Sequence, residues 1–135
     1  MWECPQCRRE FKATNQWHSC YVSTVEEHFE GKSSNLRKLY DELEKFMLSL
    51  DNFTITPTKT AIHFRKTSTF AEIKLRNNYL IISFSLDDFS NTPLVHKTFR
   101  MSKNKIVHSI QISSQNELEI VFQLLTYANK KYSEE

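Results

Sequence analysis

The chain has 135 residues, of which 39% are hydrophobic and 13% aromatic, and this predicts one globular domain of ordinary size with a small appendage. No run of eighteen apolar residues occurs and the N-terminus does not read as a signal peptide, so we expect a cytoplasmic protein without a membrane span. The formal net charge is only +2, and a chain with a single glycine cannot form most glycine-rich catalytic loops. Neither a Gly-x-Ser-x-Gly nor a His-Glu-x-x-His motif is present, so we expect that the protein is not an enzyme.

The first twenty residues contain all three cysteines of the chain and predict a metal site. Cys4 and Cys7 are separated by two residues, so one tight turn can present both thiols to the same ion. Ten further residues lead to His18, and Cys20 follows two positions later, which allows a short hairpin to complete four soft ligands. Three cysteines cannot pair completely, so a disulfide framework is the poorer interpretation. We therefore predict a zinc ribbon over residues 1–21 with a structural zinc ion as cofactor, bound by Cys4, Cys7, His18 and Cys20.

The fourth ligand has an alternative. Residues i and i+2 of a strand point to opposite faces, so a turn must bring His18 and Cys20 together. His28 is therefore the reserve ligand, although a solvent-facing position on a helix is the favoured interpretation of this histidine.

Residues 22–135 are predicted to form an α+β domain that begins with a short helix. Ser23 and Glu26 have the spacing of a capping box, which places a helix near residues 23–30. Gly31 follows the apolar pattern directly and is expected to end this helix.

Two longer amphipathic helices are predicted to flank the rest of the domain. The first covers residues 34–50, begins at Ser33 or Ser34 and has apolar residues at three- and four-residue spacing. A second capping box at Ser114 starts the other helix, over residues 114–132. Each of these helices should bury one face.

Between the two long helices the hydrophobic period changes to two, which is the period of β-strands. The connections are too short for helical crossovers, so we expect a single antiparallel sheet of about five or six strands. Both long helices should cover one face of that sheet, giving a two-layer α+β domain. The predicted strands are Phe53–Thr56, Thr60–Lys66, Phe70–Arg76, Tyr79–Leu86, Val95–Met101 and Ile106–Ile112. The residues expected in the core are Leu43, Phe46, Ile62, Phe64, Ile82, Phe84, Phe122 and Leu125, with His108 as a hydrogen-bonded core histidine.

We expect the sheet face opposite the helices to be cationic. Residues 53–112 carry nine basic and three acidic side chains, and strand alternation places several cations, together with His96, on that face. Guanidinium and ammonium groups bind phosphate or carboxylate groups. The candidate ligand-binding residues are Lys59, His63, Arg65, Lys74, Arg76 and Arg100.

This surface predicts a non-enzymatic binding module with an anionic partner, of which nucleic acid is the favoured example. A plainer interpretation is a solvated sheet face, because scattered charges on exposed strands are common. A further alternative is a pocket for a small anionic ligand, lined by Lys59, His63, Arg65 and Arg100, with the ribbon docking another protein.

A set of short motifs along the chain is similar to those of one known family. They are Trp2-x-Cys4-Pro5-x-Cys7-x-Arg9-x-Phe11, Asn15-Gln16-x-His18-Ser19-Cys20, His28-Phe29-x-Gly31-Lys32, Lys59-Thr60-Ala61-Ile62-His63-Phe64, Phe70-Ala71, Val107-His108 and Ser114-x-x-Glu117. With these motifs the chain resembles the bacterial and archaeal family called domain of unknown function 5655, some members of which are labelled predicted transport protein. The resemblance implies an N-terminal zinc ribbon fused to a small α+β domain without an established activity. Asp51-Asn52 stands where the family usually has a Gly-Pro turn before the first strand.

Overall fold

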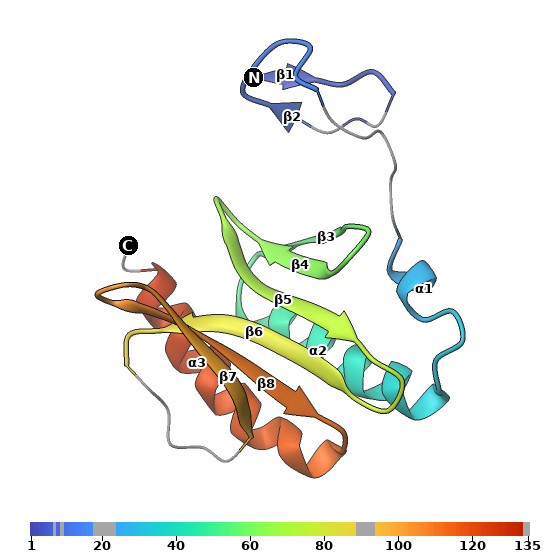
Figure 1. Ribbon diagram of the computed structural model, residues 1–135, viewed down its shortest axis with the longest axis vertical. Helices are drawn as coiled ribbons and strands as arrows, with labels where there is room; N and C mark the ends of the chain where they lie inside the picture. Colours follow the sequence, from blue (N-terminus) through green and yellow to red (C-terminus); the bar gives the residue numbers. More distant parts are fainter. Residues whose placement is uncertain (7, 9, 18–23, 89–93, 134–135) are drawn as a thin grey trace.

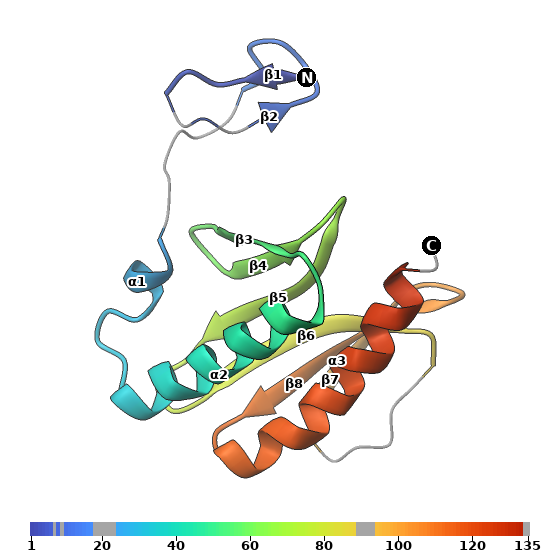
Figure 2. The same cartoon turned by 180° about the vertical axis from the view of Figure 1, so that it is seen from behind.

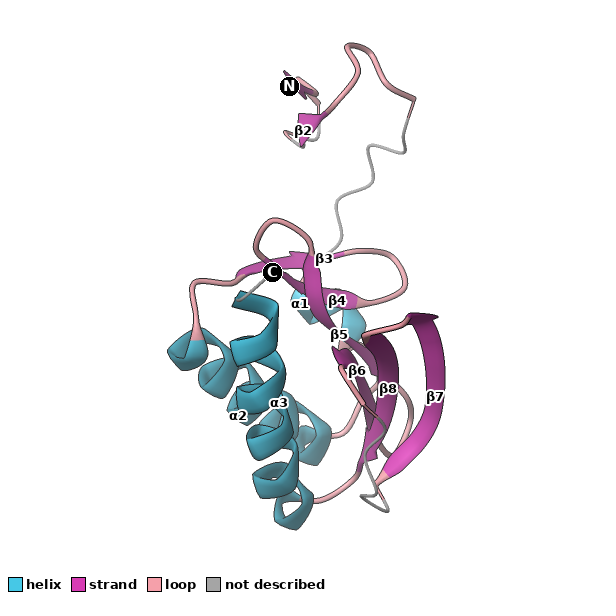
Figure 3. Cartoon of the chain, turned by 90° about the vertical axis from the view of Figure 1, so that its left-hand side faces the viewer, coloured by secondary structure: helices cyan, strands magenta, loops and turns pink. Residues whose placement is uncertain are grey.

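The computed structural model describes residues 1–6, 8, 10–17, 24–88 and 94–133. Its main body is a six-stranded antiparallel sheet with two long helices (Figure 1). Seen from the side, both helices lie against the same face of the sheet (Figure 3). The two-layer α+β architecture predicted from the sequence is confirmed. Within the described ranges, no helix has both the length and the apolar character needed to cross a membrane.

The short helix α1 (Val25–His28) comes first in the body. Its N-cap is Thr24, whose Oγ1 accepts a hydrogen bond from the Glu27 N–H at 3.2 Å. The predicted cap, Ser23, lies outside the described residues. Gly31 has a φ of +74°, a left-handed conformation that favours glycine, and it ends this helical segment as expected.

Helix α2 (Ser34–Leu50) buries the apolar stripe that its sequence predicts. Ser33 is its N-cap and accepts a hydrogen bond from the Leu36 N–H at 3.2 Å. In Figure 2, α2 and α3 lie in front of the sheet, with the inner side of each helix turned towards it. The buried residues of α2 are Leu36, Leu39, Tyr40, Leu43 and Met47.

Helix α3 (Leu118–Ser133) follows a single 3₁₀ turn at Gln115–Glu117. The Glu117 carboxylate accepts hydrogen bonds from the backbone N–H of Ser113 at 2.9 Å and of Ser114 at 3.0 Å. Partial burial on its own would raise the pKa of Glu117, but these hydrogen bonds to the charged form outweigh it and lower the pKa. The carboxylate thus anchors the start of the C-terminal helix.

We expect Glu117→Ala to lower the free energy of unfolding by about 1 kcal/mol, the usual cost of losing a helix cap. Because the folded-state pKa of Glu117 is depressed, its contribution is present above the ordinary glutamate pKa and is lost as the pH falls through the folded value. Urea unfolding at neutral and acidic pH measures both effects. Gln123→Ala, an exposed change on the same helix, is the control, and an equal loss in both variants would contradict the capping role.

The sheet runs in the order β3-β4-β5-β6-β8-β7, and every neighbouring pair is antiparallel. All six strands lie where the sequence predicts them, with ends that differ by a residue or two. The chain leaves β6, passes to the edge of the sheet as β7, and returns as β8 between them, so β7 is an edge strand. The strands are β3 (Thr54–Pro57), β4 (Ile62–Arg65), β5 (Thr69–Leu75), β6 (Leu80–Leu86), β7 (Val95–Ser102) and β8 (Lys105–Ile112).

The core lies between the sheet and the two long helices. Six of the eight residues predicted to be buried are buried, and the other two, Phe46 and Phe122, are half-buried. Their rings stack between α2 and α3 with centroids 4.2 Å apart. His108 is fully buried, and its Nδ1 donates a hydrogen bond to the Ile106 carbonyl at 2.9 Å, so the prediction of a hydrogen-bonded core histidine is confirmed.

Candidate functional site

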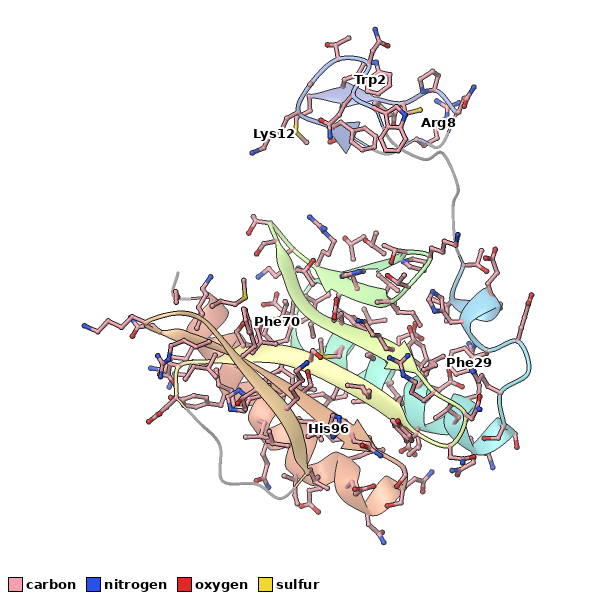
Figure 4. All side chains as sticks on the ribbon, viewed as in Figure 1. Trp2, Arg8, Lys12, Phe29, Phe70 and His96 are labelled. Atoms are coloured by element: carbon pink, nitrogen blue, oxygen red, sulfur yellow. The ribbon has the colours of Figure 1, made fainter. Side chains whose placement is uncertain are left out.

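The described N-terminal residues form a small hairpin of two strands, β1 (Trp2–Glu3) and β2 (Glu10–Phe11). Trp2 pairs with Phe11, and their ring centroids are 6.0 Å apart. Trp17, in contrast, is 90% exposed. Trp2, Arg8 and Lys12 all belong to this small unit (Figure 4).

Cys4 follows β1 directly and is only 4% exposed. The Arg8 N–H donates a hydrogen bond to the Cys4 carbonyl at 2.8 Å, and Arg8 has a φ of 64°. This bond closes a tight turn immediately after the buried thiol. The local geometry at Cys4 therefore fits one ligand of a soft metal ion. The other predicted ligands, Cys7, His18 and Cys20, lie outside the described residues.

His28, the reserve metal ligand, has a structural contact. Its Nε2 donates a hydrogen bond to the Thr58 carbonyl at 2.7 Å, which ties α1 to the turn between β3 and β4. This hydrogen bond explains the position of the His28 side chain without a role as a metal ligand.

The sheet face opposite α2 and α3, here called the open face, carries a row of paired residues that crosses all six strands. Adjacent members oppose one another in the strand register. At its centre, the hydroxyl oxygens of Ser83 and Ser109 are 2.9 Å apart and share a hydrogen bond. In order across the sheet, the row is Thr56, His63, Glu72, Ser83, Ser109 and Lys97.

Two of the predicted site residues on β4 and β5, His63 and Lys74, lie near one carboxylate. Glu72 lies 3.7 Å from His63 Nδ1 and 3.9 Å from Lys74 Nζ. Burial lowers the pKa of His63; Glu72 opposes this shift, whereas Arg65 and Lys74 add to it, so the imidazole is neutral at pH 7. Arg65 and Lys74 therefore carry the positive charge of this flank, and Glu72 offsets half of it.

Arg100 does not join these residues, contrary to the sequence prediction. It pairs with Ile106, whose side chain belongs to the core, so Arg100 lies on the helix side of the sheet. Its guanidinium donates to the Lys103 carbonyl at 2.9 Å. His96 lies at a register shift between Val95 and Lys97, near the start of the edge strand (Figure 4).

The prediction failed on β7 because its apolar residues were taken as the core side. Lys97 and Phe99 pair with Ser109 and Val107, which belong to the open face. Figure 3 shows β7 as the strand farthest from the two long helices. Phe99 and Met101 are each 63% exposed.

The remaining two predicted residues lie in turns. Lys59 is exposed in the connection between β3 and β4, and Arg76 is exposed at the turn between β5 and β6, where its N–H donates to the Tyr79 carbonyl at 2.9 Å. Neither projects from the middle of the open face.

The hairpin of β7 and β8 carries several exposed cations and no acidic residue. No acidic residue occurs from position 94 to position 116. Sequence reasoning missed this cluster because it weighed charge over a longer segment, whereas the acid-free interval itself is the signal. Its exposed cations are Lys97, Arg100, Lys103 and Lys105, and the exposed apolar residues Phe99 and Met101 lie among them.

The fold and this surface define a small α+β domain with a cationic edge hairpin. A family model described as Domain of unknown function (DUF5655) matches residues 25–128, and the chain belongs to this family. The matched residues begin at α1, so the N-terminal hairpin lies before them. No curated protein matches the chain, and no solved structure matches it.

Proposed function

We propose that the protein is a non-enzymatic module that binds nucleic acid through the β7–β8 hairpin and the adjoining open face. The observation that carries this proposal is the exposed pair Lys97 and Phe99 on the open-face side of an acid-free hairpin. A cation and an aromatic ring two residues apart on one strand face can contact a phosphate and stack on a neighbouring base.

The open face suits an extended, single-stranded ligand. Its centre is formed by the small hydroxyl residues Ser83, Ser85 and Ser109. Arg65 and Lys74 supply charge on the far flank. A strand of nucleic acid crossing the sheet would meet cations at both ends of its path and an aromatic ring at one of them.

The alternative of a small-ligand pocket has less support. His63 and Arg65 are on β4, whereas Arg100 is on β7, and β5, β6 and β8 lie between them. Four strand spacings correspond to about 19 Å. One small anion cannot contact both groups across that distance.

We further propose that the N-terminal residues form a zinc ribbon, with Cys4, Cys7, His18 and Cys20 as ligands. The support is the buried Cys4 on a closed turn together with the ligand spacing of the sequence. Four protein ligands would make the ion structural rather than catalytic. Thiolate ligands persist where thiols stay reduced, which is why we place the protein in the cytoplasm.

Binding of fluorescent single-stranded oligonucleotides at several salt concentrations tests the nucleic-acid proposal. We expect measurable affinity at low salt. The logarithm of the association constant should then fall by about 0.7 per phosphate contact for each tenfold rise in salt concentration. A double-stranded oligonucleotide of the same sequence should bind more weakly, because its bases are not available for stacking. Absence of binding to any oligonucleotide at low salt would refute the proposal.

A further inference from the structure

An imidazole and a carboxylate face each other on the open face, on two neighbouring strands. His63 of β4 and Glu72 of β5 are opposed in the strand register, and the two strands lie side by side in Figure 1. Glu72 is the only acidic residue in the six described strands of the sheet. A neighbour that neutralises this one carboxylate therefore changes the net charge of the open face.

The two side chains stop just short of a hydrogen bond. His63 Nδ1 lies 3.7 Å from a Glu72 carboxylate oxygen, whereas a charge-assisted N–H···O bond is about 2.7–2.9 Å long. Nδ1 is buried, and it has no hydrogen-bond partner among the residues that the structure describes. A buried polar atom without a partner costs free energy until it is paired. A side-chain movement of about 1 Å would join the two groups across the strands.

The surroundings of His63 keep its ring neutral at pH 7 and make it responsive to acid. Burial is the largest cause that lowers the pKa of His63, Arg65 and Lys74 lower it further, and Glu72 opposes them. On the other side, β3 places the uncharged Thr56 opposite His63. The ring therefore takes up a proton only below the ordinary histidine range. Both nitrogens of the protonated ring are donors, so Nδ1 can then donate to Glu72.

We propose that His63 and Glu72 form a proton-operated switch on the open face. At neutral pH, Glu72 offsets one of the two positive charges of Arg65 and Lys74. When His63 takes a proton from solvent, the imidazolium pairs with Glu72, and the charges of Arg65 and Lys74 are no longer offset. The open face then attracts an anionic strand more strongly. This last consequence rests on the proposed function, whereas the pairing of His63 with Glu72 does not.

NMR titration of the imidazole signals in the full chain tests the pairing without any ligand. Glu72→Gln removes the group that favours the charged ring, so the measured pKa of His63 should fall. At acidic pH the Nδ1 proton should exchange slowly with solvent in the unsubstituted chain and rapidly in Glu72→Gln. Glu119→Gln, which changes an exposed carboxylate on α3, is the matched control and should alter neither quantity. The same His63 pKa with and without Glu72 would overturn the proposal.

Binding of a fluorescent single-stranded oligonucleotide at several pH values and constant ionic strength tests the consequence. Affinity should rise about two- to fivefold as the pH falls through the His63 pKa, the effect of one partly exposed charge. His63→Gln should remove this rise, whereas His96→Gln, which changes an exposed histidine on β7, should retain it.

The two experiments separate the switch from the proposed function. If Glu72→Gln lowers the His63 pKa and no oligonucleotide binds at any pH, the switch stands and the proposed function falls. If oligonucleotides bind and their pH dependence is the same with and without His63, the switch falls and the proposed function stands.

Discussion

Removal of the proposed zinc ion should unfold the N-terminal hairpin and leave the six-stranded domain folded. The two strands of the hairpin have two residues each, and such a unit cannot offset its chain entropy by burial alone. A structural zinc ion supplies roughly 10–16 kcal/mol of apparent binding free energy in small zinc-binding peptides. The hydrophobic core of the body, in contrast, is built from residues that follow the hairpin, from Val25 onwards.

The positions of the two tryptophans make this result easy to measure. Trp2 and Trp17 are the only tryptophans of the chain, so tryptophan fluorescence reports on the N-terminal segment alone. A strong chelator should shift the emission to longer wavelength, because the Trp2 and Phe11 contact is lost, while the far-ultraviolet circular dichroism of the domain changes little. Elemental analysis of protein purified without added metal should find about one zinc ion per chain.

Single substitutions identify the ligands. Cys4→Ser and His18→Ala should reduce zinc content strongly, whereas His28→Ala should leave it unchanged. His28→Ala should instead cost about 0.5–1.5 kcal/mol of domain stability through loss of the bond to the Thr58 carbonyl. A protein that contains no zinc and keeps its tryptophan emission in chelator would contradict the metal site, and zinc loss in His28→Ala would move the fourth ligand.

The helices could be predicted from the sequence because their signals are local. Thr24, Ser33 and Glu117 each accept a hydrogen bond from a backbone N–H within four residues along the chain. The apolar stripe of α2 predicts its buried face without knowledge of the sheet. The helical spacing of the apolar residues alone shows which side of the helix they share. The six strands were predictable for a similar reason, because short connections between apolar runs allow only antiparallel pairing.

The composition of the open face was only partly predictable. Alternation tells which residues of one strand share a face, but it does not say which face meets the core. For β5 and β6 the apolar residues settle the question, because helices cover that side. On β7 the apolar Phe99 is on the uncovered side, and two register shifts change the alternation within the strand. The order of β7 and β8 at the sheet edge is a long-range property that no local pattern specifies.

Phe99 therefore lies on the open face, where Arg100 was expected, and the second large prediction concerns Phe99. Phe99→Ala should weaken binding of a single-stranded oligonucleotide by about 1–3 kcal/mol, or roughly 5- to 150-fold, because one stacked base is lost. Leu48→Ala, which removes a side chain of α2 that is 48% exposed, is the control for loss of a surface apolar group. Phe99 makes little contribution to the core, so its removal should leave the urea midpoint nearly unchanged.

Lys97→Gln should act through charge and therefore differ in its salt dependence. Loss of one phosphate contact lowers the slope of log affinity against log salt by about 0.7 on a single strand, while the loss from Phe99→Ala should be almost the same at every salt concentration. Lys38→Gln, an exposed lysine on α2, is the matched control and should change neither quantity. If Lys97→Gln and Lys38→Gln have equal effects, the protein responds only to its overall charge, and the β7–β8 hairpin is not the binding surface. If Phe99→Ala alters only the salt slope, the ring does not stack on a base, and the contact is purely electrostatic.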